Sequence, residues 1–192
     1  MPNYVQKKMT EYCHKAPKRR QYCPYEPNPI KYGKDLDKIA YEKLSDPLNK
    51  TDEKYVQRVL GSFLYYARVI DLTILHALSA IASEQAKPTE KTLKQVHQLL
   101  DYMHTNPNAV IRFRASDMIL NVHSDASYLL AGKGRSRASG YFFLGKLPRD
   151  NEPIQLNGNV AATCAILKII AASVAEAELG ALFLNMKEAR VI

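Results

Sequence analysis

The chain has 192 residues, of which 46% are hydrophobic, so it holds enough apolar material for one or two small domains. Its formal net charge is +8, and residues 1–34 carry eight Lys and Arg against two acidic residues. This basic segment indicates either a polyanionic partner such as nucleic acid or a solvated leader. The most apolar stretch, residues 63–82, is interrupted by Arg68, Asp71 and His76, which argues against a membrane span.

The cysteines and the first residues bear on where the protein works. Cys13, Cys23 and Cys164 lack the close spacing of a zinc site, and we expect all three to be reduced thiols. No apolar segment of the signal-peptide type follows Met1. We therefore expect an intracellular protein of the cytoplasm or nucleus that is not secreted.

The first fifty residues are rich in proline and tyrosine. Because each proline removes a backbone donor and restricts the preceding residue, we predict a mostly extended connector over Lys15–Asn49. Lys18, Arg19 and Arg20 are consecutive basic residues within it. We predict that they bind nucleic acid, with neighbouring tyrosines available to stack on unpaired bases.

Helical periodicity begins near Asp52, a favourable N-cap residue, and apolar residues then recur at spacings of three and four. Asp71 is predicted to cap a second helix, which forms a hairpin with the first. Thr89 is predicted to cap a third helix, which must end before Asn106-Pro107.

From Ala109 onward the period changes to two, as in strands. Four strand candidates and a final helix follow, at residues 110–114, 118–124, 139–144, 160–167 and 173–188. The order predicts an α+β fold, in which a helical hairpin region precedes a sheet with one covering helix.

Two carboxylates stand out in this second half. Asp125 follows the apolar run Met118–Val122, so it either caps a turn or is directed at a ligand. Glu178 lies in the first turns of the final helix, where it is either at a solvated margin or directed toward Asp125. The neighbouring acid Glu176 has capping-box spacing with Ser173, which gives it a structural role.

The apolar side chains of the final helix predict its orientation. Leu179, Leu182, Phe183 and Met186 recur at spacings of three and four, and we expect them to face the sheet.

The motifs in order resemble the ribonuclease H domain of copia-type retrotransposon polyproteins. The segment HSDASYLLAGKGRSRASGYFFLG (residues 123–145) and the later VAEAELGAL (residues 174–182) carry the resemblance. The family has Ser-Asp-Ala at the end of the first strand, a basic turn, a second strand and then a helix that opens with Glu-Ala-Glu. Upstream, VLGSFLYYARVIDLTILHALSAIA (residues 59–82) resembles the helical region after the polymerase palm, and MPNYV (residues 1–5) resembles the end of that palm.

The resemblance implies three segments. Residues 1–50 would be the end of the reverse transcriptase palm and a connector, and residues 51–108 a helical thumb or connection-like region. Residues 109–192 would be a ribonuclease H-like domain with a truncated mixed sheet, which stops before its third acidic strand. The absence of that strand would leave the edge of the first strand unpaired, so self-association through this edge is a further expectation.

The resemblance also implies a chemistry. Ribonuclease H enzymes hydrolyse the RNA strand of RNA–DNA hybrids with two Mg²⁺ ions held by carboxylates. Asp125 and Glu178 would be the catalytic and metal-binding acids. Arg135 and Arg137 would either contact backbone phosphate or belong to a solvated turn. Because the family's third acid has no match here, the magnesium site would be incomplete and the activity impaired. The alternatives are a non-catalytic nucleic-acid-binding fragment and an incomplete fold without activity.

Overall fold

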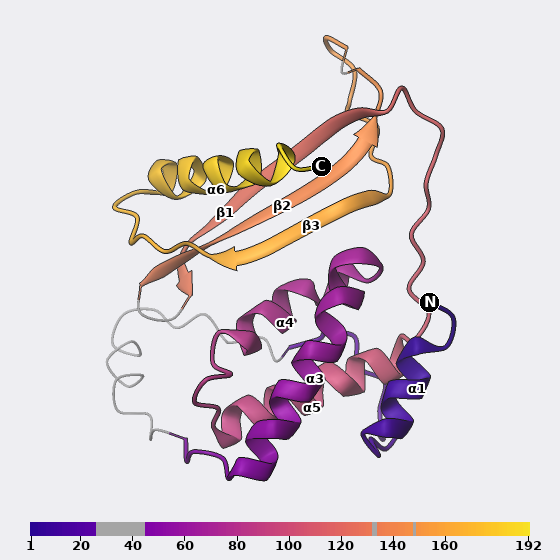
Figure 1. Ribbon diagram of the computed structural model, residues 1–192, viewed down its shortest axis with the longest axis vertical. Coiled ribbons are helices and arrows are strands. Elements are labelled where there is room, and N and C mark those ends of the chain that lie inside the picture. The colour runs from indigo at the N-terminus through magenta and orange to yellow at the C-terminus, as the bar shows by residue number, and fades with distance from the viewer. Residues whose placement is uncertain (26–44, 132–133, 148) are drawn as a thin grey trace. The chain divides into compact units, whose positions relative to one another are not determined.

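The computed structural model describes residues 1–25, 45–131, 134–147 and 149–192, and it has an α+β fold. The chain forms two compact units (Figure 1). Unit 1 comprises residues 1–62 and 81–108, and unit 2 comprises residues 63–80 and 109–192. The long helix α3 (Lys50–Val69) contributes to both.

Unit 1 is helical. It contains α1 (Tyr4–Glu11), the first part of α3 and α5 (Glu90–Thr105). The hydroxyl of Tyr4 donates to the carbonyl of Ser62 at 2.7 Å, which ties α1 to α3. Residues 4–12 are therefore part of a packed core. The buried apolar side chains of this unit are Val5, Met9, Tyr12, Val56, Val59, Leu60, Ile81, Val96, Leu99, Leu100 and Met103.

The predicted helix starts are mostly confirmed. Asp71 accepts from the backbone N–H of Thr73 at 3.1 Å and opens a short 3-10 helix, η1 (Leu72–Ile74), which leads into α4 (Leu75–Ala82). Thr89 and Asn106 bound α5 as expected. The start predicted near Asp52 is wrong by two residues, because α3 begins at Lys50. The side chain of Asn49 accepts from the N–H groups of residues 51 and 52 at this helix start.

Unit 2 contains an antiparallel sheet of β1 (Ile119–Ala131), β2 (Arg135–Gly145) and β3 (Asn159–Ile166), in the order β1-β2-β3. Within the described residues β1 is thus an edge strand. Asp125 pairs with Ser139, and Ser139 pairs in turn with Cys164.

The prediction of a strand at residues 110–114 is wrong. Val110 and Phe113 are exposed, so the alternation there does not reflect one buried face. The backbone of Arg114 is held by a side chain instead, since its N–H donates to Asn157 Oδ1 and its carbonyl accepts from Asn157 Nδ2. These bonds replace a strand ladder.

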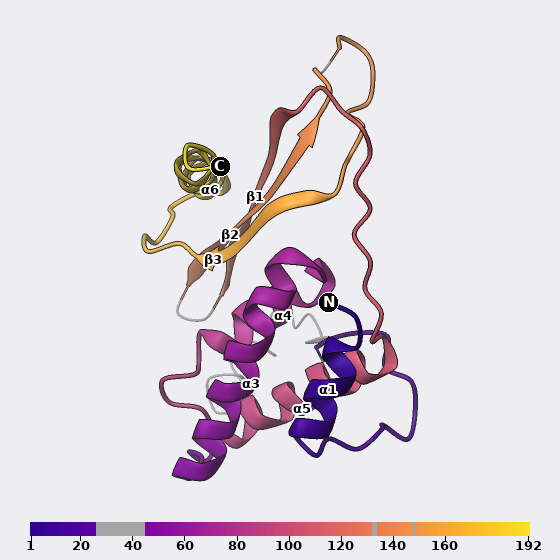
Figure 2. The same cartoon turned by 45° about the vertical axis from the view of Figure 1, so that its right-hand side comes forward.

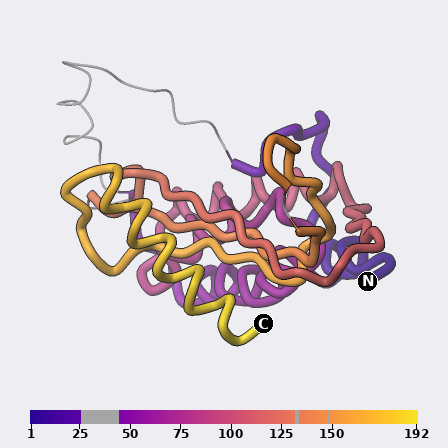
Figure 3. Tube along the Cα trace, turned by 90° about the horizontal axis from the view of Figure 1, so that it is seen from above, coloured from indigo at the N-terminus to yellow at the C-terminus, as the bar shows by residue number. Residues whose placement is uncertain are grey.

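Helix α6 (Val174–Ala189) covers one face of the sheet; it is seen end-on in Figure 2 and crosses the strands obliquely in Figure 3. Its buried residues are Ala177, Ala181 and Asn185, at a spacing of four. The predicted stripe is wrong: Leu179, Leu182, Phe183 and Met186 are between 46% and 66% exposed.

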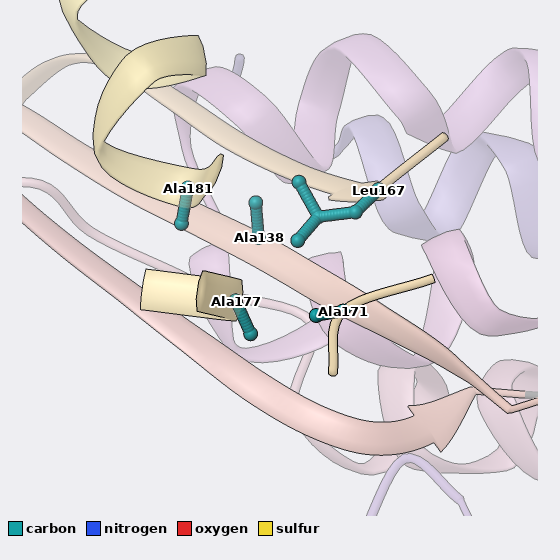
Figure 4. Packing of buried hydrophobic residues seen from close by; sticks show 5 residues of the cluster. All are labelled: Ala138, Leu167, Ala171, Ala177 and Ala181. Atoms are coloured by element: carbon teal, nitrogen blue, oxygen red, sulfur yellow. The ribbon is translucent and has the colours of Figure 1, made fainter. Parts of the chain in front are cut away.

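Small side chains explain this orientation. Ala177 and Ala181 pack with Ala138, Leu167 and Ala171 in one buried cluster (Figure 4). Because alanine carries only a methyl group, the helix backbone lies close to the sheet.

No helix among the described residues combines the length and apolar character needed to cross a bilayer.

Candidate functional site

The two faces of the sheet carry different chemistry. On the face toward α6, the amide of Asn185 donates at 2.8 Å to the hydroxyl of Ser124 and to the carbonyl of Ser139. Its oxygen accepts from the hydroxyl of Thr163 at 3.0 Å. Gly140 lies under this amide, where a side chain would collide with Asn185. Asn185 therefore holds all three strands to the helix.

Side chains alternate along a strand, so Asp125 lies on the opposite face from Ser124. There it lines a cavity of about 330 Å³ together with its same-face neighbours His123 and Ser127. The other walls come from β2, β3 and residues 72–76, and their polar members are His76, Arg137, Ser139, Tyr141, Thr163 and Cys164. Asp125 is exposed, as a carboxylate directed at a ligand would be.

The two predicted phosphate-binding arginines have different environments. Arg135 is exposed at the start of β2, whereas Arg137 is only 7% exposed. The guanidinium of Arg137 donates to the hydroxyl of Ser79 on α4. That hydroxyl donates in turn to the carbonyl of Cys164 at 2.8 Å. Arg137 is thereby anchored within unit 2, beside the cavity that Asp125 lines.

Burial and charge act on the other titratable groups of the cavity. Partial burial of the ring lowers the pKa of His76, and the positive charge of Arg137 lowers it further. Both effects favour the neutral form of His76. Burial raises the pKa of Tyr141, whose hydroxyl donates to the carbonyl of Asn157.

Glu178 lies on α6 directly after the buried Ala177, and its side chain is half-buried beside the contact with the sheet. Asp125 and the helix that carries Glu178 are on opposite faces of the sheet. Within the described ranges, no group of three or more His, Cys, Asp or Glu side chains is placed to hold a metal ion. In this arrangement the two acids do not fit one Mg²⁺ site, and their joint role stays a prediction.

The capping role of Glu176 is confirmed in a slightly different form. Ser173 Oγ accepts from the N–H of Glu176 at 3.1 Å, as the spacing predicts. The carboxylate of Glu176 accepts from the N–H of Ala172 at 2.7 Å, one residue earlier than expected.

The basic cluster of Lys18, Arg19 and Arg20 lies in unit 1 and is fully on the surface. Its segment is fastened to α5, because the N–H of Gln21 donates to Thr105 Oγ and Gln98 donates to the carbonyl of Cys23 at 2.8 Å. Tyr22, between these anchors, is 81% exposed. Lys31 and Lys34, two further basic residues of residues 1–34, lie outside the described residues.

Sequence reasoning missed Asn185 and the contribution of His76. The sequence does indicate the position of Asn185, since this residue follows Ala177 and Ala181 at a spacing of four. No sequence pattern indicates the role of His76, because its place beside the strands depends on tertiary packing. Comparisons with protein families, curated proteins and solved structures give no match for this chain.

Proposed function

We propose that the chain is a segment of a copia-type retrotransposon polyprotein, with the end of a reverse transcriptase region followed by part of a ribonuclease H-like domain. The sequence motifs around Asp125 and Glu178 support the assignment. The order of elements in unit 2 agrees with it, because three antiparallel strands precede a helix that covers one face. Such a protein would work inside the cell, in the cytoplasm or nucleus.

The ancestral activity in this proposal is Mg²⁺-dependent hydrolysis of RNA in RNA–DNA hybrids. We expect this activity to be impaired here. The observation that carries this view is the position of Asp125 on the face of the sheet opposite α6, which separates it from Glu178. Two-metal hydrolysis requires carboxylates that converge on the same ions.

A second candidate function is nucleic-acid binding without cleavage. It is favoured by the exposed cluster Lys18, Arg19 and Arg20 beside the exposed ring of Tyr22. Adjacent cations neutralise backbone phosphates, and an exposed aromatic ring provides a surface for base stacking. Because the segment is fastened to α5, it presents these groups in a fixed place.

A single set of assays separates the two functions. The full chain is incubated with a labelled RNA–DNA hybrid and Mg²⁺, and binding is measured in parallel over a range of salt concentrations. We expect binding without cleavage. The triple variant K18Q/R19Q/R20Q should reduce the salt slope by up to about 2.7, because each neutralised phosphate of a duplex contributes about 0.9.

Asp125→Asn and Glu178→Gln are the catalytic controls. We expect neither to change binding of the hybrid. Cleavage that both variants abolish would show that the two acids do form one site, and the impaired activity would be refuted. Binding with an unchanged salt slope in the triple variant would refute the role of the basic cluster.

A further inference from the structure

Arg137 is a buried cation that has no carboxylate partner among the described residues. It is 7% exposed, and the side chain bonded to it within those residues is Ser79, through its hydroxyl. In the part of the chain that the structure describes, no acidic side chain forms an ion pair with it. A guanidinium group has five N–H donors, so Ser79 satisfies only a fraction of its capacity.

The donors that Ser79 leaves unused remain accessible, because no nitrogen of Arg137 is fully buried without a hydrogen-bond partner. An anion in the cavity that Arg137 lines would accept from them. Asp125, an acid on the same face of the sheet, is exposed. It pairs across the strands with Ser139, whereas Arg137 pairs with Ser127. The positive charge of Arg137, which no described acid balances, is part of the wall of the 330 Å³ cavity.

The remaining walls are suited to a small organic ligand. Leu72, Leu75 and Ala162 give apolar surface, and Tyr141 gives an aromatic ring. Asp125 supplies carboxylate oxygens that accept hydrogen bonds, and Ser127 supplies a hydroxyl. The volume is at the lower end of the range of about 300–1,000 Å³ that is usual for ligand sites.

We propose that this cavity binds a nucleoside monophosphate, with the phosphate on Arg137. Guanidinium groups bind phosphate oxygens through parallel N–H donors, and the phosphate supplies the counter-charge that the described residues do not give Arg137. Asp125 accepts from hydroxyls of the sugar, and the ring of Tyr141 stacks with the base. The site requires neither Mg²⁺ nor Glu178, so it does not rest on the ribonuclease H assignment.

The test is calorimetric titration of the full chain with adenosine monophosphate, adenosine and inorganic phosphate. We expect adenosine monophosphate to bind at least about tenfold more tightly than either part alone, since both halves of the cavity are then used. Equal affinity for adenosine and its monophosphate would overturn the role of Arg137. Absence of binding by all three would overturn the site itself.

Variants at Ser127 avoid removing a buried side chain. Ser127 is paired with Arg137 across the strands, so Ser127→Asp places a carboxylate opposite the guanidinium and supplies the missing ion pair. We expect this variant to fold and to lose affinity for the monophosphate at least about tenfold. Ser127→Asn is the matched uncharged variant: it removes the same hydroxyl without adding a carboxylate, so its affinity should fall less than that of Ser127→Asp. Lys146→Gln is a control for general loss of positive charge and should bind within about twofold of the original chain. Equal losses in Ser127→Asp and Ser127→Asn would refute the electrostatic role of Arg137.

Discussion

The two units bury different kinds of side chain. In unit 1 the helices meet through large apolar residues, among them Leu99, Leu100 and Met103, each at most 1% exposed. In unit 2, α6 meets the sheet through Ala177, Ala181 and the amide of Asn185, while its larger apolar residues are exposed. Unit 1 is thus held mainly by apolar area. The helix of unit 2 is held by close approach and a central set of hydrogen bonds.

The largest expected difference between the units concerns leucine. Leu100→Ala should cost about 2–5 kcal/mol in the free energy of unfolding, because it leaves a cavity in a fully buried site. Leu182→Ala, on α6, should stay within about 0.5 kcal/mol because Leu182 is 46% exposed. Urea denaturation followed by circular dichroism measures both. A large loss in Leu182→Ala would mean that the leucine side of α6 is covered in solution.

The next effect concerns the polar centre of unit 2. Asn185→Ala should cost about 1–3 kcal/mol, since it leaves the carbonyl of Ser139 and the hydroxyls of Ser124 and Thr163 without their partner. Met186→Ala, at the next and exposed position, is the control and should change stability by less than about 0.5 kcal/mol. Hydrogen exchange of the α6 amides should quicken in the first variant alone. Equal exchange in both would show that the amide does not hold the helix.

Glycine substitutions should act with opposite sign in the two units. A Cβ at Gly140 would come within 2.7 Å of Thr163 Oγ and closer still to Asn185, so Gly140→Ala should cost about 1–3 kcal/mol. Gly61 lies in the helical interior of α3 with nothing within 4 Å of the added Cβ. There Gly61→Ala should stabilise by about 0.5–1 kcal/mol. Thermal melts that shift in the same direction for both would contradict this contrast.

These contrasts explain which parts of the fold could be predicted from the sequence. The helices α3 and α5 were predictable because their large apolar residues face a core at regular spacing. For α6 the same rule failed: its buried face is made of alanines, which carry little signal beside Leu179 and Phe183. The place of Asp125 in its strand was predicted wrongly. The pattern indicated a strand end, whereas β1 continues to Ala131 and Asp125 pairs with Ser139 inside it. The face on which Asp125 lies depends on the contact between Asn185 and Ser124, which the pattern does not reveal.

The cavity beside Asp125 shows the same limit. The sequence places Arg137 in the basic turn between two predicted strands, and a position in a turn favours a solvated side chain. Its burial follows from the pairing with Ser79, a residue far away in the sequence. Long-range contacts of this kind leave no local periodicity. They also place residues 63–80 with the sheet in unit 2, although these residues continue the helical region along the chain.

The smallest expected effect is a pH dependence shared by both units. Burial lowers the pKa of His97 in unit 1, with a further decrease from His14, and partial burial and Arg137 lower the pKa of His76 in unit 2. The folded chain therefore binds fewer protons than the unfolded chain when the pH falls below about 6.5, the ordinary value for histidine. Because unfolding then takes up protons, stability should decrease as the pH falls from 7.5 to 5.5. Both rings are partly exposed, so the slope should be shallow. Urea midpoints at three pH values test it, and His97→Gln and His76→Gln should each flatten the slope, since glutamine does not titrate. A midpoint that rises toward pH 5.5 would show that protonated histidines are favoured by the fold, opposite to the expected sign.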